Sequence, residues 1–293
     1  MKYDEFKNYV VNAVKDMMEP GTEVSVNEVQ KNNGVVLDGL SILRPGEKAS
    51  PVLYLQEYYN EVSRGDSSAA EAAEKIIRMY NEHKTDYFSV EQLVDFEKVR
   101  SQLYPKIVNR NRNGELIKSI PHRSILDLEI VYYQELPETQ SCSATRTIRN
   151  KDLEMWGISE DELHDIAVKN MRMDKPVMVE SMPSIFKMFG DSGDSSEMGE
   201  LMFVVTTKNL RFGAVSITEP DIFKKISEKI GGDLYIIPSS VHEVIVIPAS
   251  SSEANDIKEI VMQVNITAVS AQEFLSNSVY FYDKEKNEIS IAA

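Results

Sequence analysis

The chain has 293 residues, of which 42% are hydrophobic and 27% are charged, and its formal net charge at pH 7 is −15. This balance is typical of a soluble globular protein with one large domain or two ordinary ones. The acidic charge opposes attraction to phosphate backbones and anionic membranes, so we expect neither a nucleic-acid partner nor a membrane partner.

The single cysteine, Cys142, excludes an internal disulfide, and the histidines are too dispersed to form a metal motif. Phosphate-binding and dinucleotide-binding glycine motifs are absent, so we expect no metal and no cofactor. No segment approaches the roughly 18 to 20 apolar residues of a membrane span, and the first residues are not patterned as a signal peptide. We therefore expect a cytoplasmic protein.

The N-terminal half predicts a helix, a β-hairpin and further helices. Apolar residues at three- and four-residue spacing indicate a helix over 4–17, and Asn33-Gly34 favours a tight turn between strands. Alanines at helical spacing, among them Ala70, continue the helical pattern. The expected elements are a helix at 4–17, strands at 24–30 and 35–43, a strand at 52–55, and helices ending at Gly65, at 67–83 and at 89–102.

A basic strip over 105–123 interrupts the acidic chain. We predict a solvated loop or hairpin whose charges pair with nearby acids, and a site for an anion or partner is the alternative. The alternation of 124–136 then predicts a single strand with one wet face. Residues 137–143 are rich in turn formers, so we place the boundary there, between regions 1–136 and 144–293.

The C-terminal half predicts a mostly antiparallel sheet with helices on one face, which makes the chain an α+β protein. Ser159 followed by Glu162 indicates a helix start, and 189–200 fits a mobile loop better than a calcium loop. The expected elements are a strand at 144–150, a hairpin at 201–217, a helix from Thr218 to Gly231, strand pairs within 234–247 and 278–292, and a helix at 253–264. In the last helix, Ile257, Ile260, Val261 and Val264 are expected to face inward.

The segment PSSVHE, residues 238–243, gathers the residue types of a serine hydrolase. Ser239 or Ser240 would be the nucleophile and His242 the base. The usual G-x-S-x-G elbow is absent, and an extended chain from Val241 would point His242 and Glu243 to opposite faces. The alternatives are a structural turn and a recognition site.

Several stretches resemble a family of uncharacterised bacterial proteins common in anaerobic gut-type bacteria. They include KNNGVVLDGLSI, YLQEYY, PHRSILDLEIVYY, MWGISEDELHDIAVKN and TTKNLRFGAVSI with PSSVHE, and they cover nearly the whole chain. The resemblance implies no activity, but it singles out PHR and PSSVHE as places to test.

Together these patterns predict a non-catalytic protein that binds a protein or a small molecule, with a hydrolase using Ser239, Ser240 and His242 as the alternative. The candidate binding residues are His122, Arg123, Ser239, Ser240, His242 and Glu243.

Overall fold

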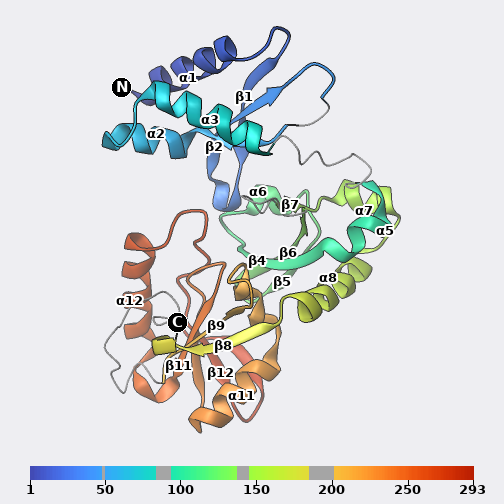
Figure 1. Cartoon of the computed structure of the whole chain (residues 1–293). Coiled ribbons are helices and arrows are strands. Elements are labelled where there is room, and N and C mark those ends of the chain that lie inside the picture. The colour runs from blue at the N-terminus through green and yellow to red at the C-terminus, as the bar shows by residue number, and fades with distance from the viewer. Residues whose placement is uncertain (48–49, 84–93, 137–144, 185–200) are drawn as a thin grey trace. The chain divides into compact units, whose positions relative to one another are not determined.

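A computed structural model describes residues 1–47, 50–83, 94–136, 145–184 and 201–293. The chain divides into two units, one within Met1–Asp95 and one formed by Phe96–Leu136 with Thr145–Ala293 (Figure 1). This division differs from the expected one, because 96–136 belongs with the C-terminal half. The expected linker at 137–143 and the loop at 189–200 lie outside the described residues.

The first unit packs helices on a three-stranded antiparallel sheet in the order β1-β2-β3. Phe6, Val10 and Val14 recur on one face of the first helix and are buried with Leu40 of the second strand. The elements are α1 (Tyr3–Met17), β1 (Glu23–Gln30), β2 (Val36–Leu43), β3 (Val52–Tyr54), α2 (Leu55–Arg64) and α3 (Ala69–His83). The predicted order of elements is confirmed here, and Asn33 takes the left-handed turn conformation with φ 60°.

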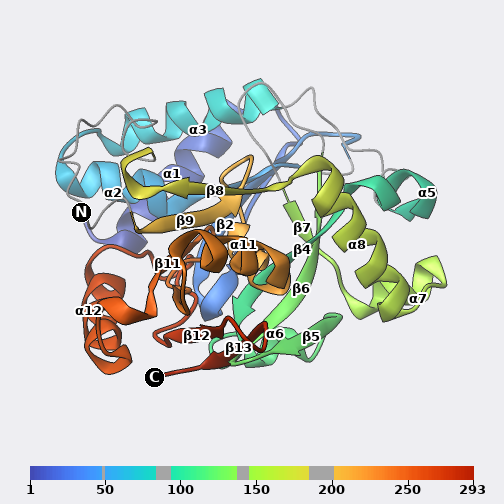
Figure 2. The ribbon, with the colours of Figure 1, turned by 90° about the horizontal axis from the view of Figure 1, so that it is seen from below.

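In the second unit, one sheet has four strands among the described residues, in the order β4-β6-β5 with β7 paired to β6. The strands are β4 (Leu103–Asn109), β5 (His122–Ile125), β6 (Leu128–Glu135) and β7 (Thr145–Thr147). Around them lie α5 (Phe96–Val99), η2 (Arg100–Gln102), α6 (Gly114–Ile117), α7 (Asn150–Trp156) and α8 (Glu160–Asp174). The Ser159 side chain accepts a hydrogen bond from Glu162 N–H at 3.1 Å and so caps α8, which runs alongside this sheet (Figure 2).

The other sheet of this unit has six described strands, all antiparallel, in the order β13-β12-β10-β11-β9-β8. They are β8 (Val177–Ser181), β9 (Phe203–Thr207), β10 (Leu234–Ile237), β11 (Val244–Pro248), β12 (Tyr280–Asp283) and β13 (Glu288–Ile291). The helical segments are η3 (Gly213–Thr218), α11 (Pro220–Ile230), η4 (Ala249–Ser251) and α12 (Ala254–Thr267). The predicted α+β class and antiparallel sheet are confirmed.

Alternate residues of the six-stranded sheet enter two different cores. Ile236 of β10 belongs to the large core that also contains Phe223 of α11 and residues of the four-stranded sheet. Its neighbour Ile237 belongs to a small core with Ile257 and Val261 of α12. Successive side chains of a strand point to opposite faces, so α12 covers the second face of the sheet, in addition to the helix cover expected on one face.

The predicted single strand over 124–136 is wrong. The chain turns at Leu126, whose φ is 52°, and forms the β5–β6 hairpin (Figure 2). Both faces of β6 are buried from Leu128 to Gln134, because β6 lies inside the sheet and is covered on each side. A fully covered strand has no wet face, so alternation in its sequence carried no information about exposure.

Other local predictions also need correction. The expected hairpin at 201–217 has only its first strand, and the 3₁₀ helix η3 takes the place of the second. Helix α11 begins after Glu219, while the hydroxyl of Thr218 donates to the Val215 carbonyl at 2.8 Å. In α12, Ile260 is 62% exposed and Val264 is also exposed, because the helix buries only its Ile257–Val261 stripe. In α3, Ala70 is exposed and its neighbours Ala69 and Ala72 are buried instead.

Candidate functional site

The segment Pro238–Glu243 connects β10 to β11 and is held by the backbone of 273–276. Val241 N–H donates to the Glu273 carbonyl at 2.9 Å, and Leu275 N–H donates to the Ser239 carbonyl at 2.9 Å. Strand β11 begins at Val244, so His242 and Glu243 lie in a turn. The extended conformation assumed from Val241 onward is therefore wrong, and alternation does not separate these two side chains.

Ser240 is bonded within this turn. Its side chain, in a residue that is 7% exposed, accepts a hydrogen bond from the backbone N–H of His242 at 3.0 Å. Burial raises the pKa of the Glu243 carboxyl above its usual value, while a hydrogen bond from Ser240 and the proximity of His242 oppose the shift. The turn therefore holds a half-buried carboxyl beside a hydroxyl and an imidazole.

The imidazole of His242 is placed by Phe212. Its Nδ1 accepts the Phe212 N–H at 3.3 Å, so the neutral ring carries its proton on Nε2, which lies 3.5 Å from a carboxylate oxygen of Glu273. The two rings stack with centroids 5.6 Å apart and planes inclined by 23°. The His242 side chain is 26% exposed, so a ligand can reach the edge of its ring.

The loop at 208–212 that carries Phe212 is strained. Leu210 and Phe212 have φ values of 56° and 55°, in the left-handed region that residues with a Cβ rarely adopt. The hydroxyl of Thr207 donates within this loop to the Arg211 carbonyl at 2.8 Å. Such conformations cost about 1–3 kcal/mol each and persist only where surrounding contacts impose them.

Gly213 allows the loop to approach the His242 turn. Its N–H donates to the His242 carbonyl at 2.8 Å. A Cβ at this position would lie 2.5 Å from that carbonyl oxygen and 2.5 Å from the Cα of Thr206, and would also overlap the Thr206 hydroxyl. The approach of the loop to the turn therefore requires a left-handed conformation at Phe212 and a residue without a side chain at the next position, Gly213.

Cations gather around the aromatic pair formed by Phe212 and Tyr133, whose centroids are 4.9 Å apart. The Lys106 ammonium lies 5.1 Å from the Phe212 centroid, and the Arg211 guanidinium carbon lies 5.5 Å from it. Lys175 Nζ lies 3.2 Å from the Tyr133 hydroxyl. Sequence reasoning placed Lys106 in the basic strip but missed the cluster, because its members come from distant segments.

Lys175 is itself a buried cation with an acidic partner. It is 7% exposed, its Nζ lies 2.5 Å from a Glu135 carboxylate oxygen, and it lies 3.9 Å from the ring centroid of Tyr104. A buried charge with a partner and aromatic neighbours is satisfied. We therefore assign Lys175 a structural role, in which it supports Tyr133 of the aromatic pair.

The candidate residues of the PHR segment lie elsewhere in this unit. His122 Nδ1 lies 3.0 Å from the Ile120 carbonyl, and Arg123 forms an ion pair with Asp161 at the start of α8. Beside them, the Tyr132 hydroxyl is 2.9 Å from His164 Nδ1. No described hydrogen bond or ion pair joins His122 or Arg123 to the Pro238–Glu243 turn.

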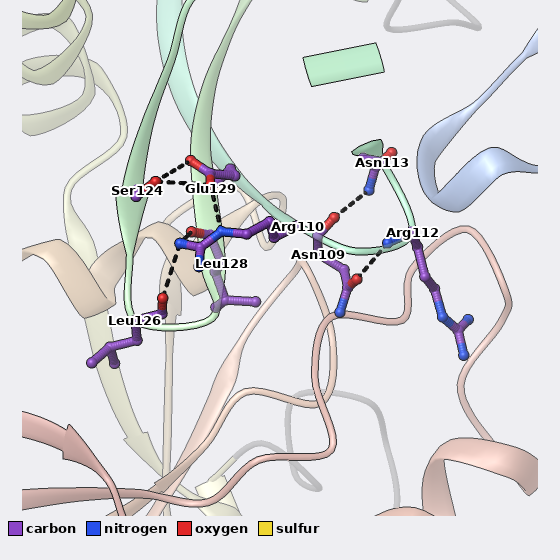
Figure 3. Close-up of polar contacts among 8 residues, drawn as sticks. All are labelled: Asn109, Arg110, Arg112, Asn113, Ser124, Leu126, Leu128 and Glu129. Carbon is purple, nitrogen blue, oxygen red and sulfur yellow. Dashed lines mark hydrogen bonds and ion pairs between the residues drawn. The ribbon is translucent and has the colours of Figure 1, made fainter. Parts of the chain in front are cut away.

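Much of the basic strip is bound to the protein itself. Arg110 Nε lies 2.6 Å from a carboxylate oxygen of Glu129, a residue only 3% exposed, and the same guanidinium donates to the carbonyls of Leu126 and Leu128 at 2.9 and 3.1 Å (Figure 3). Ser124 donates to the same carboxylate at 2.9 Å. This arrangement stabilises the β5–β6 turn and uses Arg110 for the fold rather than for a ligand.

The described residues contain no group of three or more His, Cys, Asp or Glu side chains that could hold a metal ion. Within the same ranges, none of the helices has the length and apolar character to cross a lipid bilayer.

The fold and the turn together define a two-unit α+β protein with a polar candidate site in its larger unit. Residues 3–284 match a family of unknown function, DUF5688, and the chain belongs to that family. No curated protein and no solved structure matches it.

Proposed function

We propose that this chain is a non-catalytic binding protein whose recognition site is formed by the loop 208–213 and the turn 238–243. The observation that carries the proposal is the strained loop at Leu210 and Phe212 beside the partly exposed His242. Strained non-glycine residues cluster at ligand sites, where the surrounding contacts are built to hold them. Packing of the sheet alone does not require a strained loop here, so a ligand-binding role accounts for the strain.

The hydrogen bonds of the turn favour recognition over hydrolysis. Ser240 accepts from a backbone N–H, and its hydroxyl bonds to the Glu243 carboxyl rather than to the imidazole expected as the base. His242 Nδ1 is engaged by Phe212, and Nε2 faces Glu273. A nucleophile needs a base that accepts its proton, and both ring nitrogens here have other neighbours. A hydrolase based on Ser239, Ser240 and His242 remains the alternative.

The proposal includes the setting of the protein. We propose a cytoplasmic location for this chain, supported by its one cysteine, and a bacterial family, supported by the sequence resemblance described above. The partner is a small molecule or another protein.

A thermal-shift screen with a library of small metabolites tests the binding function. We expect at least one compound to raise the unfolding midpoint of the wild type, with the effect reduced in His242→Ala and Glu243→Gln. Lys118→Ala is the matched control, because Lys118 is exposed and its ion pair in the described part of the chain is a local one, with Glu115 at 2.7 Å. An effect that is equal in all variants would place the binding elsewhere.

The same preparations test hydrolysis with a generic activated ester. We expect the wild-type rate to equal that of Ser240→Ala and His242→Ala. A turnover that disappears in both variants, while their circular dichroism stays native, would replace the binding function with the hydrolase.

A further inference from the structure

We propose that the ligand of this site carries an anionic oxygen group, a carboxylate or a phosphate, which binds beside Phe212 through Lys106 and Arg211. This inference rests on the proposed function and names the chemistry of its ligand. It starts from the convergence of cationic side chains on one aromatic ring.

The two cations come from different parts of the unit. Lys106 lies on β4, on the face of the four-stranded sheet that also carries Tyr133, and Arg211 lies in the loop that follows β9. They lie 5.1 and 5.5 Å from the Phe212 centroid, within the roughly 6 Å range of a cation–π contact. Two long cationic side chains therefore contact the same half-buried ring.

The surroundings raise the effect of these charges. Lys106, Arg211 and Phe212 are all half-buried, so the local dielectric is lower than in water and a charge there acts more strongly on an anion. A guanidinium binds carboxylate and phosphate groups with two parallel hydrogen bonds, which an ammonium group supplements as a point charge.

The neighbouring acids define where an anion can sit. Glu135 is occupied by Lys175 at 2.5 Å, whereas the Glu273 carboxylate lies 3.5 Å from His242 Nε2 and disfavours an anion at that edge. Lys106 and Arg211 are therefore the favoured contacts for an anion. Both cations also make further interactions, so an anion joins an existing set of partners.

The charge of the whole chain makes the cluster selective. At −15, the protein repels anions in general, so an anion binds only where cations converge. An anion site at Phe212 would also explain why a family-like loop, KNLRFG, places an arginine between two strained residues.

Titrations with inorganic phosphate and with acetate test the inference, each against sodium chloride at matched ionic strength. The readout is the unfolding midpoint of the full chain. We expect at least one of the two anions to raise the midpoint in a saturable way, and the more effective one identifies the group as phosphate or carboxylate. No anion-specific shift for the wild type would overturn the inference.

Variants then locate the binding. We expect Lys106→Met and Arg211→Gln to weaken the apparent affinity at least tenfold, Lys106→Arg to retain it within about threefold because the charge remains, and Lys118→Gln to leave it unchanged. Lys118 belongs to the same basic strip and serves as the matched control. Equal affinity in Lys106→Arg, Lys106→Met and Arg211→Gln would overturn the inference. If instead the library yields only neutral or cationic ligands that His242→Ala abolishes, the binding function stands and the anionic ligand is wrong.

Discussion

Replacing Gly213 with alanine should lower the free energy of unfolding of the larger unit, because the structure leaves no room for the new methyl group. It would lie 2.5 Å from the His242 carbonyl oxygen and from the Thr206 Cα, both of which belong to backbone that cannot move independently. The φ of Gly213 lies outside the left-handed region, so the effect is steric rather than conformational.

The magnitude follows from three contributions. Overpacking by one methyl group costs about 1–3 kcal/mol, and weakening the hydrogen bond from Gly213 N–H to the His242 carbonyl costs about 1 kcal/mol. Alanine also lowers the conformational entropy of the unfolded chain, which offsets about 0.4–1 kcal/mol of this loss. The net loss is about 2.5 kcal/mol, or roughly 5–10 °C in the unfolding midpoint of a unit of this size.

Urea denaturation of wild type, Gly213→Ala and Gly232→Ala measures the effect. Gly232 is a matched control, because a Cβ there meets nothing within 4 Å and its φ is also outside the left-handed region. We expect Gly232→Ala to change the free energy of unfolding by less than about 0.5 kcal/mol. A loss below that value for Gly213→Ala would refute the contact between the Phe212 loop and the His242 turn.

Three further changes test other features of this unit. Ser216→Ala should stabilise it by about 1 kcal/mol, because the Ser216 side chain is 0% exposed and its hydroxyl has no hydrogen-bond partner among the described residues; a lower unfolding midpoint would contradict this. Glu129→Ala should cost about 1.5–3 kcal/mol by removing the charged hydrogen bonds that its carboxylate accepts from Arg110 and Ser124, and an unchanged urea midpoint would exclude that role. The pKa of Glu243 is higher in the folded protein than its ordinary value of 4.5. Its contribution to the free energy of unfolding is therefore present below pH 4.5 and is lost as the pH rises through the folded pKa. Urea denaturation across this pH range should show that Glu243→Gln removes this part of the pH dependence.

The sequence predicted correctly those turns and helix ends that depend on contacts between residues close together in the chain. Asn33-Gly34 forms the predicted turn, and Ser159 caps α8 with the predicted hydrogen bond to Glu162. Gly231 ends α11 in the left-handed conformation that a helix end requires.

Long-range contacts explain what the sequence did not reveal. Leu126 adopts a left-handed turn without being glycine or asparagine, and the contacts that hold it come from Arg110, which precedes it by 16 residues. The candidate site likewise joins Lys106, Phe212 and His242 from β4 and two separate turns. Proximity in the sequence drew attention to PSSVHE, but the partner that places its histidine is 30 residues away.

The ion pair of Arg110 with the buried Glu129 has a consequence for how the unit opens in solution. The guanidinium bonds at once to the end of the β5–β6 turn and to a carboxylate on β6, while its own backbone directly follows β4. Separating the hairpin from β4 would leave the buried Glu129 carboxylate without its cation, so we expect the turn and the sheet to open together. The amide protons of these three strands should therefore exchange with solvent as one cooperative group.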